Sequence, residues 1–168
     1  MNAPHNFMEG RRFFFVEMLV LVAAAGFVVV VLAIRGRRRD HPLWRDVCVR
    51  RSKLKGAGDG LFALRPFKEG DKICDYRGQV LSLRKALEAE NRDYIMCLGL
   101  NCHVDASNAF DVPGRYVNDN FDTTHLNAEF RKQKHLFKAT LVATKSINVG
   151  DEIYASYGQA YWRPRGTQ

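Results

Sequence analysis

The sequence predicts a mainly β fold of small curled sheets with one or two short helices, together with one N-terminal transmembrane helix. Three observations support this prediction. The apolar runs after Trp44 are short, turn sequences that contain glycine and aspartate separate them, and one long apolar segment lies near the N-terminus. The chain has 168 residues, so we expect one folded domain with a core of ordinary size after the apolar segment.

The long apolar segment covers residues 13–34 and follows an N-terminal tail of residues 1–12. It contains one charged side chain, Glu17, and as a helix it is long enough to cross a bilayer core of about 30 Å. More arginines follow the segment than precede it, which predicts a single-pass membrane protein whose C-terminal domain faces the cytoplasm. A cleaved signal peptide, a buried core helix and a start codon assigned too far upstream are the alternatives that the sequence leaves open.

We predict a short basic linker over residues 35–44, the folded domain over residues 45–162 and a C-terminal tail over residues 163–168. Half of the formal net charge of +8 lies in residues 1–39, so the folded domain is only mildly basic. Its candidates for a nucleic-acid-binding stripe are Lys53, Lys55, Arg131, Lys132 and Lys134. We interpret these side chains as a solvated face and expect no direct nucleic-acid binding.

The strands expected in the folded domain are short apolar runs between turn sequences. In order, they cover residues 47–49, 61–64, 72–76, 79–81, 103–106, 136–143 and 152–157. Only residues 82–98 have apolar side chains at helical spacing, which predicts a helix there. Gly56, Gly58 and Gly60 form a Gly-x-Gly-x-Gly pattern between the first two expected strands. Its spacing differs from that of a dinucleotide-binding loop, and a run typical of a strand follows it, so it predicts a tight hairpin turn.

The four cysteines include no Cys-x-x-Cys pair and have no histidine at ligand spacing, so we expect no metal site. They are Cys48, Cys74, Cys97 and Cys102. We interpret them as reduced thiols in the core, and two disulfides in a secreted domain are the alternative. We interpret His125 and His135 as surface or packing residues, because no acid or nucleophile partner is recognisable for them.

Several motifs occur in a fixed order along the folded domain. They cover residues 52–63, 67–71, 75–78, 93–96, 104–106, 114–118 and 150–158. In order and spacing these motifs resemble those of SET-domain protein lysine methyltransferases. The resemblance implies the SET fold, in which two segments, here residues 115–118 and 152–158, pack together as a pseudoknot. It also implies transfer of a methyl group from S-adenosyl-L-methionine to the side-chain amine of a lysine in a histone or non-histone protein.

The resemblance implies a role for individual residues as well. Tyr157 would be catalytic by orienting the methyl group and the amine, and Tyr76 would be catalytic while lining the lysine channel. The residues implied in cofactor binding are Ala57, Gly58, Asp59, Tyr94, Asn118, Asp119 and Trp162. The residues implied in the substrate channel are Tyr76, Phe130 and Ala155.

Three departures from the family pattern affect these expectations. Asp119 stands where the family usually has histidine, and residues 120–125 form a longer segment than the usual turn. A Cys-rich tail does not follow the domain, so Tyr161 and Trp162 would have to close the lysine channel. Because a carboxylate beside the cofactor could disturb binding, the alternative function is a catalytically inactive SET-like module that binds a peptide or the cofactor at a membrane.

Overall fold

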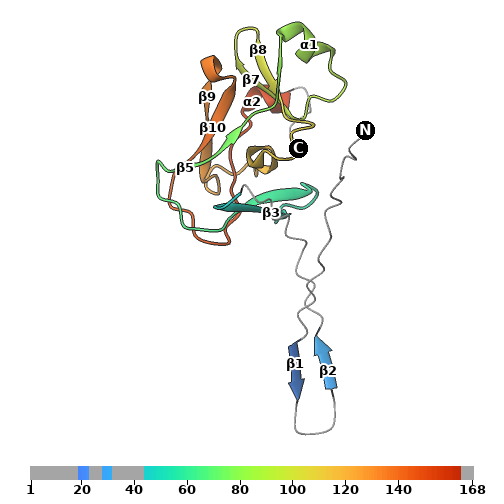
Figure 1. The fold of residues 1–168 in the computed structure, drawn as a ribbon, viewed down its shortest axis with the longest axis vertical. Coiled ribbons are helices and arrows are strands. Elements are labelled where there is room, and N and C mark those ends of the chain that lie inside the picture. The colour runs from blue at the N-terminus through green and yellow to red at the C-terminus, as the bar shows by residue number, and fades with distance from the viewer. Residues whose placement is uncertain (1–18, 23–27, 32–43, 164–168) are drawn as a thin grey trace, which may run out of the picture. The chain divides into compact units, whose positions relative to one another are not determined.

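The computed structural model describes residues 19–22, 28–31 and 44–163, which fall into two units (Figure 1). In the first unit, Met1–Arg35, strand β1 (Leu19–Val22) pairs in antiparallel fashion with β2 (Val28–Val31). The predicted helix over residues 13–34 is therefore wrong at these positions. Both strands are rich in valine, whose β-branched side chain favours extended backbone over helix. The other residues of the predicted helix lie outside the described residues.

None of the helices in the described part of the chain is long and apolar enough to cross a membrane. The described helices are all short and belong to the second unit, Gly36–Gln168. The prediction of a mainly β unit with small sheets and few short helices is confirmed there.

The second unit contains three small antiparallel sheets (Figure 1). The first is the pair β3 (Val47–Arg51) and β4 (Asp59–Ala63). The second has the order β5 (Lys72–Tyr76), β10 (Lys138–Ala143), β9 (Ala128–Gln133). The third has the order β6 (Gln79–Leu81), β8 (Cys102–Asp105), β7 (Ile95–Gly99).

The β3–β4 pair is the hairpin that the glycine pattern predicts. Val47 lies opposite Ala63, and the loop is closed by a hydrogen bond of 2.9 Å from the Ser52 amide to the Gly58 carbonyl. Gly58 has φ +76°, a conformation that glycine adopts without steric cost, so the hairpin prediction is confirmed.

The helical region between the second and third sheets is shorter than predicted. Helix α1 covers Leu83–Glu88, begins at the N-cap Ser82 and is followed by β7 rather than by further helix. The Asn91 side chain accepts a hydrogen bond of 2.8 Å from the Asp93 amide. The helix has already ended at Glu88, because Ala89 adopts an extended backbone with ψ 130°, and the turn at Asn91 then leads the chain into β7.

Strands β9 and β10 also differ from the prediction. Residues Lys134–Leu136 form a 3-10 turn, η2, and Phe137 adopts φ +51°, so β10 begins later than expected. Strand β9 was not predicted, because Ala128 and Phe130 are its only apolar residues. It lies at the edge of its sheet, where it pairs with β10 and has one further bridge from Ala128 to Ala155, and an edge strand tolerates such polar composition.

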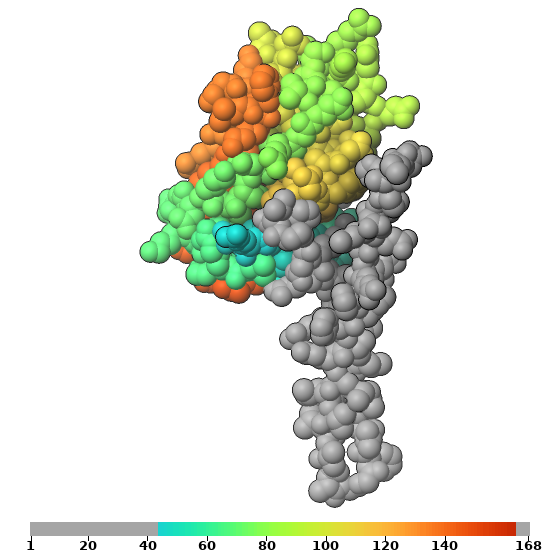
Figure 2. All heavy atoms as spheres, viewed as in Figure 1, coloured from blue at the N-terminus to red at the C-terminus, as the bar shows by residue number. Residues whose placement is uncertain are grey.

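The two segments predicted to form the pseudoknot, residues 115–118 and 152–158, pair with one another, and we call this pair of segments the pseudoknot. A second 3-10 turn, η1 (Pro113–Tyr116), contacts β3, β4 and β5, and Figure 2 shows its gold atoms beside the green atoms of the β5 region. Beyond it, Asn118 forms a parallel bridge with Tyr154, and the Ala155 amide donates a hydrogen bond of 3.0 Å to the Asn118 carbonyl. The stretch 152–157 therefore runs as isolated bridges rather than as the regular strand that we predicted. Helix α2 (Gln159–Trp162) follows it.

Two groups of buried apolar residues form the core. The larger group includes residues of β3, β4, β5, β10 and the pseudoknot, and the smaller group includes Tyr76 and residues of β7, β8 and β10. Phe130 packs against both groups. Phe130, with its edge against the Tyr76 ring, therefore lies where the two groups meet.

Candidate functional site

Tyr157 lies at the end of the second pseudoknot segment, just before helix α2. Its hydroxyl donates a hydrogen bond of 2.7 Å to the Val117 carbonyl, so the two segments of the pseudoknot fix the position of the phenol oxygen. Burial raises the pKa of Tyr157 above its ordinary value, and the nearby groups of Tyr161, Tyr76 and Asp119 raise it further. The hydroxyl therefore stays protonated at neutral pH and acts as a donor rather than as a base.

Tyr76, the second predicted catalytic residue, lies at the end of β5. It is buried, its hydroxyl donates a hydrogen bond of 2.6 Å to the Tyr94 carbonyl, and its ring meets the Phe130 ring edge-on at a centroid distance of 5.6 Å. Burial raises its pKa as well, and the charge of Asp105 adds to this effect. Tyr76 thus contacts Phe130 and Tyr94 and lies near enough to Tyr157 to affect its pKa. These four residues come from four separate segments of the chain.

Arg115 positions Tyr94. This arginine was not among the predicted site residues. Its guanidinium carbon lies 4.1 Å from the centre of the Tyr94 ring. The same guanidinium donates to the carbonyl oxygens of Ala106 and Ser107, each at 2.9 Å. A cation at this distance from an aromatic face attracts it, so Arg115 ties Tyr94 to the loop after β8. The available signal was a lone arginine within the motif of residues 114–118.

The predicted cofactor loop lies beside Asn118. The Asn118 amide nitrogen donates a hydrogen bond of 3.0 Å to the Asp59 carbonyl, which joins the first motif to the pseudoknot. Ala57 is exposed, and no other atom lies within 4 Å of the place where a Cβ would stand on Gly58. The Asn118 side-chain oxygen accepts no hydrogen bond from the residues that the structure describes. A ligand that brings a hydrogen-bond donor can thus approach both Gly58 and Asn118.

Glu152 supports this arrangement from within the core. It too was not among the predicted site residues. It is 2% exposed. Its carboxylate accepts hydrogen bonds from the Ser52 hydroxyl at 2.6 Å, the Lys53 amide at 2.7 Å, the Tyr154 hydroxyl at 2.7 Å and the Asn118 amide at 3.4 Å. A Cβ on Gly60 would overlap the Glu152 carboxylate, so glycine is required there for space.

Asp119 and Trp162 are joined by a hydrogen bond between their side chains. One oxygen of the buried Asp119 carboxylate accepts hydrogen bonds from the Tyr157 amide at 2.8 Å and from the Trp162 indole at 3.0 Å. The Trp162 ring is nearly parallel to the Tyr157 ring, with an interplanar angle of 10° and a centroid distance of 5.8 Å. The cofactor contacts expected of Asp119 and Trp162 stay predictions.

The predicted channel residues lie in different surroundings. Ala155 is fully buried in the larger group of core residues, Tyr76 belongs to the smaller group, and Phe130 contacts both. Phe130 therefore stands between the other two. Their joint function as a lysine channel stays a prediction.

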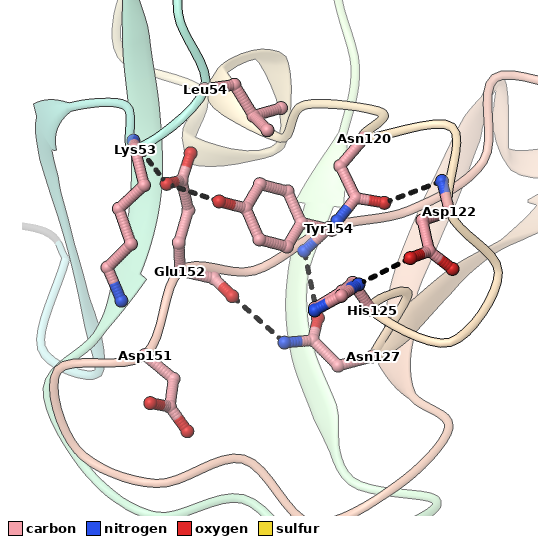
Figure 3. Close-up of a pocket in the computed structure, with 9 residues that line it drawn as sticks. All are labelled: Lys53, Leu54, Asn120, Asp122, His125, Asn127, Asp151, Glu152 and Tyr154. Atoms are coloured by element: carbon pink, nitrogen blue, oxygen red, sulfur yellow. Dashed lines mark hydrogen bonds and ion pairs between the residues drawn. The ribbon is translucent and has the colours of Figure 1, made fainter.

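An open pocket of about 480 Å³ lies beside the site but contains none of the predicted site residues (Figure 3). Its lining comprises Lys53, Leu54, Asn120, Asp122, His125, Asn127, Asp151, Glu152 and Tyr154. Figure 3 shows Tyr154 between Glu152 and Asn127, and both contact it through hydrogen bonds. The pocket meets the predicted site at Glu152, which also contacts Asn118.

Two further expectations from sequence need correction. His125 is an exposed surface residue, as predicted, but it does have an acidic partner, because its Nδ1 lies 2.8 Å from an Asp122 carboxylate oxygen. The partner was hidden because it lies in the irregular segment 120–125, where sequence spacing predicts no contact. All four cysteines are free thiols, but Cys97 is exposed rather than buried, since it lies on the open face of the edge strand β7.

Comparison with known proteins places this site in a family. The chain matches the family model described as SET domain over residues 58–158. It is 32% identical over 119 residues to an N-lysine methyltransferase KMT5A-A of Danio rerio, with 62% of this chain and 33% of that protein covered. It is 25% identical over 116 residues to an N-lysine methyltransferase KMT5A of Xenopus tropicalis, with 62% and 34% covered.

A third relative is the histone-lysine N-methyltransferase EZH2 of Chaetomium thermophilum, 25% identical over 130 residues that cover 70% of this chain and 8% of that protein. The chain thus spans about a third of the length of the first two relatives and much less of the third. The match to the family model extends over more than half of the chain and includes strand β4, Tyr76, Tyr94, Tyr157 and the pseudoknot described above. The chain therefore belongs to the SET-domain family.

Proposed function

We propose that the protein transfers a methyl group from S-adenosyl-L-methionine to the side-chain amine of a lysine in a protein substrate. The family and the named activities of the relatives support protein lysine methylation in general. The observation that carries the proposal is the position of Tyr157, whose protonated hydroxyl is fixed on Val117 beside Tyr76 and Tyr94.

The cofactor supplies an electrophilic methyl group on a sulfonium. The lysine nitrogen uses its lone pair to form the new C–N bond while the C–S bond breaks, and the electron pair of that bond stays on sulfur. A lysine ammonium has a pKa of about 10.4, so it must first release a proton to solvent, and an apolar channel favours the neutral amine. The chain's residues have to align the reacting atoms and exclude water.

The raised pKa values of Tyr157 and Tyr76 support a mechanism in which the lysine proton goes to solvent and the two tyrosines only align the reacting atoms. Burial keeps both hydroxyls protonated, so neither removes the lysine proton at neutral pH. Tyr157 would position the amine and the methyl group, and Tyr76, held on the Tyr94 carbonyl, would line the channel with Phe130.

The residues near Gly58 suit the cofactor. The open space beside Gly58 permits close approach to the backbone, and the Asn118 side-chain oxygen is available to accept a hydrogen bond from the cofactor's amino group. Tyr94 and Trp162 offer aromatic surface, on which a purine can stack.

The test is methyl transfer by the full chain. The chain is incubated with radiolabelled S-adenosyl-L-methionine and a mixed protein extract, and labelled lysine is identified after hydrolysis. Tyr157→Phe should slow transfer by about 10² to 10³, on the scale of losing one oriented polar group in a dry site, while folding changes little. The rate should rise with pH as the amine loses its proton.

Tyr116→Phe is the matched control, because it also removes a tyrosine hydroxyl that donates to a backbone carbonyl, that of Phe110 at 3.1 Å. Wild-type rates in Tyr157→Phe would show that Tyr157 is a packing residue. Labelling that is absent with every protein in the extract, despite cofactor binding by calorimetry, would support the alternative of an inactive binding module, which Asp119 in place of histidine motivates.

A membrane location is a separate proposal that rests on sequence alone. The apolar residues 13–34 and the arginines after them motivate a single-pass protein with its C-terminal domain in the cytoplasm. Membrane fractionation of the full-length protein, followed by protease treatment of intact vesicles, tests it. Protection of the C-terminal domain inside secretory vesicles would contradict the orientation, and a shortened mature form would indicate a signal peptide.

A further inference from the structure

The buried Asp119 carboxylate joins two distant parts of the chain. It is 7% exposed. One oxygen accepts a hydrogen bond of 3.0 Å from the Phe121 amide, within its own loop. The other accepts from the Tyr157 amide at 2.8 Å and from the Trp162 indole at 3.0 Å, both in the C-terminal segment. Both oxygens are therefore occupied by protein donors.

The segment that Asp119 holds has little stability of its own. Helix α2 covers only Gln159–Trp162, and its N-cap Gly158 provides no side-chain hydrogen bond. A helix of this length does not form alone, because its first turn costs more conformational entropy than its hydrogen bonds return. Tertiary contacts must keep it in place.

Those tertiary contacts are aromatic. Trp162 lies nearly parallel to Tyr157, and its centroid is 4.3 Å from that of Phe121 and 4.7 Å from that of Tyr161. Tyr161 in turn meets Tyr157 edge-on at 4.8 Å. Aromatic faces allow sliding, whereas the indole hydrogen bond to Asp119 fixes one edge of the Trp162 ring.

We propose that Asp119 is a positioning residue that latches the aromatic segment Tyr161–Trp162 onto Tyr157. The latch fixes both the backbone amide of Tyr157 and the ring that covers it, and so it orients the Tyr157 hydroxyl. Its effect on rate rests on the proposed methyl transfer, whereas the latch itself rests on the geometry of this chain.

The chemistry of the three partners explains why a carboxylate serves here. Two backbone amides and one indole N–H are all donors, and an ionised carboxylate is an acceptor only. A neutral histidine has one accepting nitrogen, and its other nitrogen is itself a donor. Asp119→His therefore cannot satisfy the three donors, so the residue that is usual in the family should release Trp162 in this chain.

The latch can be tested by the fluorescence of Trp162. Trp44→Phe leaves Trp162 as the sole indole and keeps an aromatic ring against Tyr116, which Trp44 meets edge-on. In this full-length background, Asp119→Asn and Asp119→His should shift the Trp162 emission to longer wavelength and increase its quenching by acrylamide. Asp122→Asn is the matched control, because this exposed aspartate of the same loop has its hydrogen bonds with Asn120, Thr124 and His125.

Fluorine NMR of the otherwise unaltered chain, labelled with 5-fluorotryptophan, gives the same information should Trp44→Phe impair folding. The Trp162 resonance should move in both Asp119 variants, and the Trp44 resonance should not. Unchanged Trp162 emission, quenching and resonance in both variants would overturn the latch.

The effect on catalysis is a separate measurement. Asp119→Asn should lower kcat by about 10-fold to 100-fold, as expected for a displaced reacting group, with a smaller change in KM for the protein substrate. In Trp162→Phe, which keeps an aromatic ring but loses the indole donor, adding Asp119→Asn should have a smaller effect. A released Trp162 with unchanged kcat would overturn the positioning role. Absence of transfer by the wild type would count against the proposed function, while the fluorescence would still decide the latch.

Discussion

Glu152 and Asp119 are both buried carboxylates near Asn118, but they hold different parts of the chain together. Glu152 binds the loop of the first hairpin through Ser52 and Lys53. Asp119 binds Tyr157 and the short helix that ends at Trp162. Both are acceptors surrounded by donors. We infer that Glu152 maintains the fold, because it joins the hairpin loop to Asn118 and Tyr154, whereas Asp119 maintains the geometry of the site.

The largest effect is expected at Glu152. Glu152→Ala removes the acceptor for the Ser52 and Tyr154 hydroxyls and for the Lys53 amide, and it should lower the free energy of unfolding by about 3 to 5 kcal/mol. Urea denaturation followed by circular dichroism measures it. Glu129→Ala is the control, since the exposed Glu129–Arg131 pair should contribute less than about 1 kcal/mol. Equal losses in the two variants would remove the distinction between core and surface carboxylates.

Removing a half-buried carboxylate should cost a free energy of unfolding between the losses expected at Glu152 and Glu129. Asp75 is partly buried, which by itself would raise its pKa, but hydrogen bonds from Lys138, Lys72 and Thr140 outweigh burial and lower it. Asp75→Asn should therefore lower the free energy of unfolding by about 1 to 2 kcal/mol at neutral pH.

This loss depends on pH in a defined direction. Because the folded pKa of Asp75 is lowered, its stabilisation is complete above the unfolded pKa of about 3.9 and disappears as pH falls through the folded value. Denaturation of wild type and Asp75→Asn at several acidic pH values should show converging stabilities. A difference that grows as the pH falls would contradict the assigned sign.

The smallest effect is expected at Asp122. Hydrogen bonds from the Thr124 hydroxyl and amide and from His125 lower its pKa to about 2, yet the group is fully exposed. Exposed pairs of this kind contribute little to stability, so Asp122→Asn should leave the urea midpoint unchanged within error. An NMR titration of Asp122 should still find the lowered pKa. A clear loss of stability would show that the segment 120–125 is part of the core.

The sequence predicted strands well where apolar runs were short and bounded by turns. Strands β5 and β6 have the predicted bounds, because nearly all their residues are apolar or alternate in character. Strand β9 escaped prediction because its residues are mostly charged and its place depends on pairing with β10. The helical spacing over residues 82–98 misled, because leucine and alanine fit a helix, whereas the chain leaves the helical conformation at Ala89 and enters β7.

The candidate site was predictable from motif order rather than from local pattern. Tyr76, Asn118 and Tyr157 were identified through the family resemblance, since no spacing rule connects residues so far apart. Glu152 and Arg115 escaped because their partners are backbone atoms and hydroxyls of distant segments. A buried carboxylate has no sequence signal of its own, because burial is decided by the fold.

The glycine pattern of the first hairpin has a consequence for its redesign. Gly58 satisfies a backbone demand, because its φ is positive and no atom stands near the position of a Cβ. Gly60 satisfies a demand for volume, because the Glu152 carboxylate occupies the position that a Cβ would need. The backbone of Gly58 therefore suits a D-residue, which favours positive φ, whereas an L-alanine would have space there but a strained backbone. At Gly60 an added methyl group is acceptable only together with a shorter acid at position 152, so these two positions form one unit of the design.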